Sequence, residues 1–155
     1  LDNLEGREEW GVKVYCDFNM LKMNLIKEDG EIKKMDGDIE SSSEGRAYLL
    51  RKKRDDLLEK MLNRKINEYG QDSFEKLKTF SIDTRINKIK PREVTGREDE
   101  MILNTAFLLE KNKIKDLLYA LNYLKVKYND KGLYFNCTVP WPPHNFCSIK
   151  KEGAI

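Results

Sequence analysis

The sequence of 155 residues predicts an α+β domain, in which a four-stranded antiparallel sheet carries two helices on one face. Four segments alternate apolar and polar side chains, as half-buried strands do. Two longer segments repeat apolar residues at three- and four-residue steps, as helices do. Their order is strand, helix, strand, strand, helix, strand. Right-handed crossovers then bring both helices to the same face of the sheet.

The first predicted strand, residues 9–17, is the one around which the sheet is built. Its alternation places one set of side chains toward the core and the other away from it. The inner set is Trp10, Val12, Val14 and Cys16, and the outer set is Gly11, Lys13, Tyr15 and Asp17. Residues 18–26 follow as a short helix or a loop on the core. Residues 27–43 hold turn-forming pairs and three serines, so we predict a surface insertion without regular structure.

A long helix is predicted over residues 44–69, with Ser43 as its N-cap and Gly70 closing it. Its apolar stripe comprises Leu50, Leu57, Leu58, Met61, Leu62, Ile66 and Tyr69. The basic run at residues 51–54 has the composition of a nucleic-acid-binding cluster. Consecutive helical residues point all round the axis, however, and acidic residues lie within one turn, so a solvated helix surface is favoured.

The second strand is predicted at residues 80–87, with Phe80, Ile82, Thr84 and Ile86 on its inner face. A polar connection, residues 88–99, leads to a third strand at residues 101–109. Apolar residues lie on both of its faces, which is typical of a central strand covered on both sides. One face holds Met101, Leu103 and Phe107, and the other holds Ile102, Ala106 and Leu108. The second face is expected to be covered by a further domain, by residues 18–26 or by a partner.

A second helix over residues 112–128 and a last strand over residues 133–139 complete the predicted domain. The result is a ferredoxin-like βαββαβ sandwich, in which the first and third strands are central. Residues 140–146 then place three prolines around a tryptophan. Such a segment is stiff and polyproline-like, so it loses little entropy on docking its aromatic rings against an apolar surface, of the same chain or of another molecule.

Composition limits the function. The net charge of +2 gives no global field for nucleic acid or an anionic membrane, and the longest apolar run is too short to span a bilayer. The three cysteines, Cys16, Cys137 and Cys147, show no paired spacing, which favours a reducing, cytosolic setting. With His144 as its single histidine, the sequence predicts no metal site or cofactor. No carboxylate is paired with a base or nucleophile, so we predict that the chain is not an enzyme.

Four motifs resemble the gas vesicle protein L/F family (GvpL/GvpF) in content and order. They are Glu-Trp-Gly-Val-Lys-Val-Tyr at 9–15, Gly-Arg-Ala-Tyr-Leu at 45–49, Arg-Glu-Asp-Glu-Met-Ile-Leu-Asn at 97–104 and Pro-Trp-Pro-Pro-His-Asn-Phe at 140–146. Val139 and His144 depart from the glycine and tyrosine usual in the family. The chain resembles the C-terminal domain of such a protein over residues 8–149. Because it begins at Leu1, we expect a single domain, 1–155, from a longer two-domain protein.

The resemblance implies an accessory or minor structural role in building gas vesicles, the gas-filled shells that give some microbes buoyancy. It implies a cytoplasmic location at the gas vesicle, and as partners the small hydrophobic main shell protein and other accessory gas vesicle proteins. An RNA-binding module of the same fold is the alternative, because Tyr15 could stack a base on the outer sheet face. The predicted protein-binding residues are Arg46, Arg51, Arg54, Arg92, Arg97, Leu108, Trp141, Pro142, Pro143 and Phe146.

Overall fold

The sheet has four antiparallel strands, and its two central strands are the ones that the sequence predicts. In the computed structural model, which describes residues 6–138, four antiparallel strands pair in the order β2-β3-β1-β4. The central strands are β1 (Arg7–Cys16) and β3 (Glu100–Glu110), and the edge strands are β2 (Asp83–Ile86) and β4 (Leu133–Thr138). The first and third strands are therefore central, and this prediction is confirmed.

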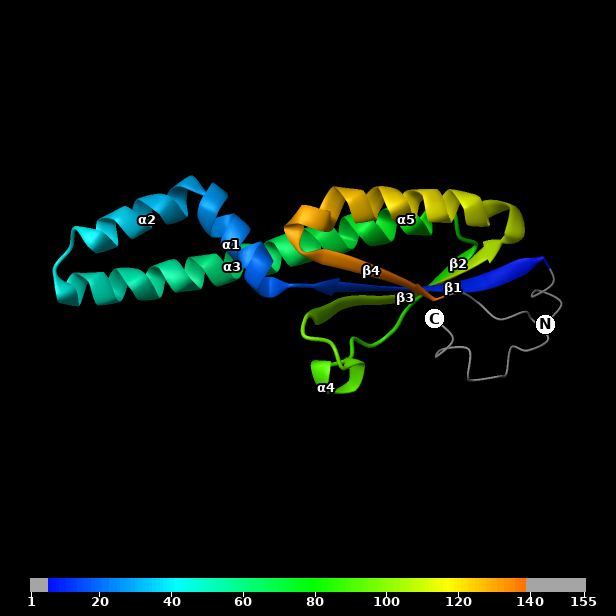
Figure 1. The fold of residues 1–155 in the computed structure, drawn as a ribbon, viewed down its shortest axis with the longest axis horizontal. Coiled ribbons are helices and arrows are strands. Elements are labelled where there is room, and N and C mark those ends of the chain that lie inside the picture. Colours follow the sequence, from blue (N-terminus) through cyan, green and yellow to red (C-terminus); the bar gives the residue numbers. More distant parts are fainter. Residues whose placement is uncertain (1–5, 139–155) are drawn as a thin grey trace.

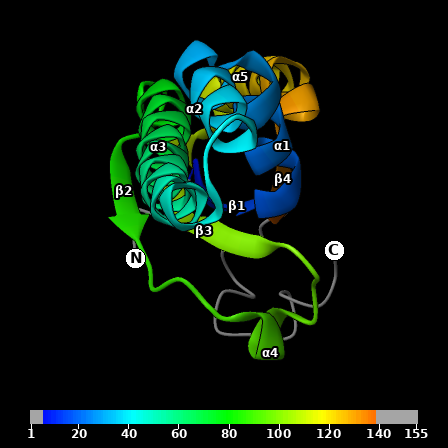
Figure 2. The same ribbon diagram turned by 90° about the vertical axis from the view of Figure 1, so that its left-hand side faces the viewer.

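Two helices cover one face of the sheet, α3 (Glu44–Lys78) and α5 (Ile114–Tyr128) (Figure 1). The short helix α4 (Arg92–Thr95), in the connection between β2 and β3, lies on the opposite side of the sheet (Figure 2). Short 3-10 turns, Lys111–Lys113 and Asn129–Lys131, flank α5. The connection thus occupies part of the second face, whereas residues 18–26, which we expected as one possible cover, lie on the helical side.

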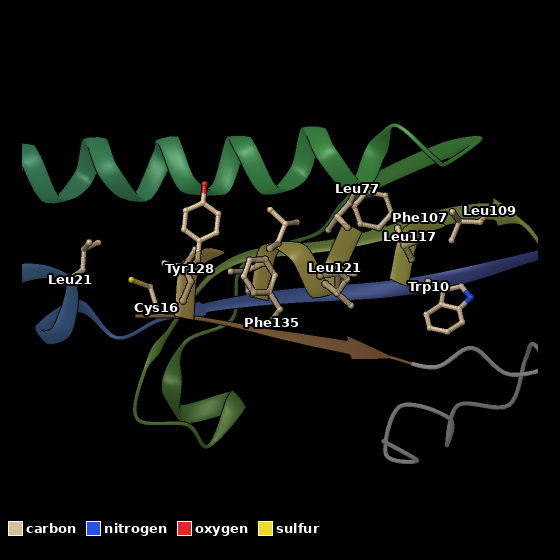
Figure 3. Packing of buried hydrophobic residues seen from close by; sticks show 14 residues of the cluster. Trp10, Cys16, Leu21, Leu77, Phe107, Leu109, Leu117, Leu121, Tyr128 and Phe135 are labelled. Atoms are coloured by element: carbon tan, nitrogen blue, oxygen red, sulfur yellow. The ribbon is translucent and has the colours of Figure 1, made fainter. Parts of the chain in front are cut away.

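The core lies between the two helices and the sheet (Figure 3). Phe107, Leu117 and Leu124 are fully buried there, and Tyr128 and Phe135 are buried beside them. Each fully buried side chain of this size contributes about 1.5–3 kcal/mol relative to leaving it in water. This single cluster holds α3 and α5 on the sheet.

Residues 27–43 are not an irregular insertion, and that prediction is wrong. They contain helix α2 (Gly30–Glu40), which follows α1 (Phe18–Glu28) and packs antiparallel to the first half of α3. The Asp29 side chain caps α2 by accepting the Ile32 N–H at 2.9 Å. Ile32 is fully buried against Leu25 and Leu58. We call α1, α2 and the first half of α3 the arm, because they project beyond the sheet (Figure 1).

Helix α3 continues past its predicted end. It runs to Lys78, so Gly70 lies inside it and does not close it. The buried side of the helix continues through Ser73 and Leu77, which are both fully buried. The Ser73 hydroxyl donates to the Tyr69 carbonyl at 2.8 Å, so this polar group is satisfied within the helix. Ser43 occupies the N-cap position as predicted, without a side-chain capping hydrogen bond.

The alternation of side chains between the two faces of β3 is interrupted by a β-bulge near the start of the strand. Val14 pairs with Leu103 but Tyr15 pairs with Met101, so Ile102 is an extra residue without a partner in β1. Ile102 consequently packs against the core cluster, while the Met101 sulfur accepts the N–H of Lys90 from the connection. The predicted faces of Met101 and Ile102 were therefore wrong.

Edge strand β2 is shorter and more exposed than predicted. Ile82 and Ile86 share the helical side of the sheet but are 46% and 65% exposed. The strand lies at the sheet edge after the end of α3, so little covers these two side chains. At this edge the Asp83 carboxylate accepts the N–H of Thr84 at 2.9 Å.

Candidate protein-interaction surfaces

The face of the sheet turned away from α3 and α5 is the first candidate surface. We call it the outer sheet face and define it by residues on three adjacent strands. Leu108 of β3 lies between Glu9 of β1 and Asp83 of β2. Ala106 of β3 lies between Gly11 of β1 and Arg85 of β2. A shallow hollow is lined by Glu9, Asp83, Thr84, Arg85, Ala106 and Leu108.

Leu108 is the apolar centre of this hollow. It is half-buried, and its neighbours across the two adjacent strands are the acidic Glu9 and Asp83. One register step away, Ala106 has Gly11 and Arg85 as neighbours. A small apolar strip is therefore bordered by charges of both signs, which is the composition of a protein-binding patch with a polar rim.

Arg97 covers the other end of the outer sheet face. Its guanidinium lies 3.9 Å from the centre of the Tyr15 ring and makes two hydrogen bonds to Asp99, at 2.7 and 2.8 Å. The Asp99 hydrogen bond raises the pKa of Arg97 further, so the side chain is always charged. Tyr15 is buried as a result. Arg97 thus fixes the connection to the sheet through a cation–π contact and a two-pronged ion pair.

A polar network joins α3 to α5 on the helical side. Asp72 accepts hydrogen bonds from Lys76, Lys127 and Tyr128, the Lys127 bond at 2.9 Å. Burial alone would raise the pKa of Asp72, but these three donors outweigh it and lower the pKa to about 2. Burial and the Asp72 hydrogen bond raise the pKa of Tyr128. The network is a structural tie between the two helices.

Reactive groups are scarce among residues 6–138. Burial, with the charges of Asp17 and Asp99, raises the pKa of the Cys16 thiol to about 12, and burial also raises the pKa of Cys137. Both thiols therefore stay protonated near neutral pH and are poor nucleophiles. Within this range no three His, Cys, Asp or Glu side chains converge to hold a metal ion. None of the helices described is both long enough and apolar enough to cross a membrane.

The solvent side of α5 is a surface that the sequence analysis did not single out. Leu118, Tyr119, Tyr123 and Val126 are all exposed there, although each is a large apolar or aromatic residue. Tyr119, Tyr123 and Val126 follow one another at steps of four and three residues, a spacing that is visible in the sequence as a second stripe on the predicted helix.

Residues 1–148 of the chain match the model of a protein family described as gas vesicle synthesis protein GvpL/GvpF. The chain is a member of the GvpL/GvpF family. No protein with a curated description matches it. Among the solved structures that share its fold are two of the gas vesicle protein GvpF. The one from an Anabaena species (strain PCC7120) has a TM-score of 0.68 at 20% identity, and the one from Microcystis aeruginosa has 0.57 at 14%.

Each alignment covers 96% of this chain but 57% of the GvpF chain, so the chain spans little more than half the length of its structural relatives. The likeness shows the mixed helix and strand fold with its antiparallel sheet.

The residues predicted to bind a partner do not form one surface in this GvpL/GvpF chain. Arg46 and Arg51 are exposed on the arm, whereas Arg54 is half-buried and pairs with Asp36 of α2 at 2.8 Å. Arg92, the first residue of α4, pairs with Glu100 of β3 at 3.0 Å. Arg97 and Leu108 lie at opposite ends of the outer sheet face. The remaining predicted residues, Trp141, Pro142, Pro143 and Phe146, lie outside the described residues.

Proposed function

We propose that the chain acts in gas vesicle assembly by binding the main shell protein through the outer sheet face. Other accessory gas vesicle proteins are further partners in this proposal, and its place of action is the gas vesicle in the cytoplasm. The observation that carries it is the strip of Ala106 and Leu108 at the centre of a hollow with a rim of opposite charges.

The mechanism is burial of apolar surface, with no bond made or broken. A strongly hydrophobic subunit in water tends to aggregate, and covering part of its surface lowers the free energy of the soluble form. Burial is worth about 25 cal/mol per Å² of apolar area, so a gain of several kcal/mol needs a few hundred Å² of contact, of which the strip of Ala106 and Leu108 is the centre. Association entropy offsets much of this, which makes a reversible complex the expected outcome.

The alternative of an RNA-binding module is less well supported. It requires an aromatic ring exposed on the outer face of a central strand. Tyr15 is the ring in the predicted position, but it is buried beneath the Arg97 guanidinium. Its face is therefore already occupied by a cation within the same chain.

Two finer features of the domain belong to the same proposal. The strand order and the two helices on one face support a ferredoxin-like βαββαβ architecture with the arm as an insertion after β1. The proline-rich segment, residues 140–146, is proposed to supply a second set of contacts to the shell protein through Trp141 and Phe146.

Co-purification of the chain with the main shell protein tests the proposal. We expect Leu108→Asp to weaken capture by about tenfold or more, because it places a charge in the apolar strip. Arg85→Gln, in the rim of the same hollow, is the matched control and is expected to change capture by less than about threefold. The unfolding midpoint of each variant is measured in parallel.

A chain lacking residues 139–155 separates the two proposed contact regions. Retained but weaker capture is expected, because the outer sheet face stays available. Equal capture by Leu108→Asp and Arg85→Gln, with both variants folded, would contradict a binding role for the outer sheet face. Binding of a single-stranded RNA oligonucleotide at moderate salt, with no capture of shell protein, would favour the alternative.

A further inference from the structure

Helix α5 is apolar on two opposite sides. Leu117, Leu121 and Leu124 are buried against the sheet and α3. On the solvent side, Tyr119 is 80% exposed, Val126 72%, Tyr123 51% and Leu118 41%. A helix buried along one side normally carries polar residues on the opposite side, so large apolar side chains there mark a surface that a partner can cover. Figure 1 shows α5 as an outermost layer of the domain, so nothing in the described residues provides that cover.

We propose that this outer stripe of α5 docks one amphipathic helix of a partner protein, whose apolar residues are flanked by carboxylates. We define the outer stripe as Tyr119, Tyr123 and Val126, with the less exposed Leu118 at its border. It lies on the helical side of the molecule, away from the outer sheet face, and so stands independently of the shell-protein proposal. Two observations identify the occupant, the spacing of the stripe and the charges beside it.

The spacing fits a helix. Tyr119, Tyr123 and Val126 follow one another at steps of four and three residues, which is the a/d spacing of a coiled-coil seam. Seven residues of α-helix span about 10 Å, the length over which two crossing helices contact each other. The stripe is also narrow and convex, whereas an extended peptide needs an open strand edge for its backbone hydrogen bonds.

The charges select an acidic partner. Helix α5 carries Lys115, Lys125 and Lys127 but only one acid, Asp116. Lys127 is engaged by Asp72, whereas Lys115 and Lys125 make no ion pair within residues 6–138. A partner helix with Glu or Asp beside its apolar seam would pair with these two lysines. Such rim pairs contribute more to partner selection than to affinity.

The same charges argue against a second copy of this chain as the occupant. In a two-fold symmetric contact through the outer stripe, each copy of α5 contributes the same excess of lysines, so positive charge meets positive charge across the interface. Like charges across an interface cost free energy. Self-association through α5 is therefore disfavoured.

Two designed helical peptides of about 20 residues test the proposal. Both carry the same Leu and Ala seam, one flanked by Glu and the other by Lys. Titrated against the 155-residue chain by fluorescence anisotropy, the Glu peptide is expected to bind about tenfold or more tightly than the Lys peptide. NMR shift changes on addition of the Glu peptide are expected along α5.

Combining Tyr119→Ala with Val126→Ala should weaken the affinity of the chain for the Glu peptide by about tenfold or more. Tyr48→Ala, at another exposed tyrosine on the arm (63% exposed), is the matched control and should leave the affinity unchanged. Both altered positions are highly exposed, so melting should not shift. Should the double variant melt early, Tyr119→Lys alone provides the same test.

Equal affinity for the two peptides, an unaffected double variant, or shift changes confined to the outer sheet face would overturn the proposal. Sedimentation of the chain alone tests the rival occupant. A dimer that Tyr119→Lys dissociates would also overturn the proposal, in favour of a second copy. A monomer supports it.

Discussion

The molecule has two regions that differ in how much apolar surface they bury: the sheet with the helices that cover it, and the arm. The first region buries a continuous cluster that includes Phe107, Leu117 and Phe135, with contributions from strands β1, β3 and β4 and from both helices. The arm has a small cluster of its own with three buried residues, Leu25, Ile32 and Leu58, and partly buried neighbours. Ala47 is buried in the arm as well, and Leu21 of α1 belongs to the larger cluster. Because stability follows buried apolar area, the arm should open locally at a free energy well below that of global unfolding.

The largest effect is expected from Phe107→Ala, in the cluster beneath α3. The ring is fully buried and packs 6.0 Å from the Phe74 ring, centre to centre. Truncation should lower the free energy of unfolding by about 3–5 kcal/mol. Denaturant titration followed by circular dichroism measures this loss. A loss below about 1 kcal/mol would mean that the central cluster does not dominate stability.

Ile32→Ala removes the centre of the arm cluster. We expect a local loss of about 2–4 kcal/mol, because the side chain is fully buried between α1 and α3. Hydrogen exchange should speed up in α2 and in the first half of α3, with β1 and β3 still protected. Ile86→Ala, at an exposed position, is the control. Equal loss of protection in arm and sheet would show that the two regions unfold as one unit.

Acid should weaken the tie between α3 and α5. The folded pKa of Asp72 is lowered from 3.8 to about 2, so its contribution is fully present above pH 4 or so and is lost as the pH falls toward 2. A shift of this size, discounted for partial exposure, corresponds to about 1–2 kcal/mol. Unfolding measured from pH 6 to 2 should show less pH dependence in Asp72→Asn. An unchanged pH profile would contradict this role.

Gly70→Ala should give the smallest effect, and a stabilising one. An added Cβ meets nothing within 4 Å, and Gly70 lies inside a continuous helix. Replacing glycine by alanine in a helix interior is worth about 0.5–1 kcal/mol. A raised melting temperature is expected. A lowered one would support a helix that ends at Gly70, as the sequence pattern predicts, and would separate the arm from the rest of α3.

The sequence predicted the sheet and α5 well because their apolar residues repeat with clear periods of two and of three to four. The arm was missed for a physical reason. Ile32, Met35 and Ile39 have helical spacing, but Gly30 and Gly37 are turn formers by composition. The N-cap of Asp29 and the packing of Ile32 outweigh that preference. Local propensity is a weak guide where tertiary burial decides.

Other features of the structure could not be predicted from a single sequence, because they depend on residues that are far apart in the chain. The extra residue at Ile102 depends on how β1 and β3 align, which pairing geometry decides and composition does not. The role of Arg97 depends on Tyr15, 82 positions earlier by difference of their numbers. The Leu108 hollow was predictable only in part: the apolar side chain was, but its neighbours Glu9 and Asp83 come from two other strands.

The hydrogen bond from the Thr84 N–H to the Asp83 carboxylate affects whether copies of the chain join through edge strand β2 at high concentration. Asn87 donates its N–H to Asn104 of β3, so in an antiparallel ladder the Thr84 N–H faces away from the sheet. The Asp83 carboxylate accepts the hydrogen bond of the Thr84 N–H, so this donor is not available to an approaching strand, which also meets the negative charge of Asp83. At this edge the Thr84 amide is thereby closed to an approaching strand, which disfavours strand-by-strand joining of copies of the chain through β2.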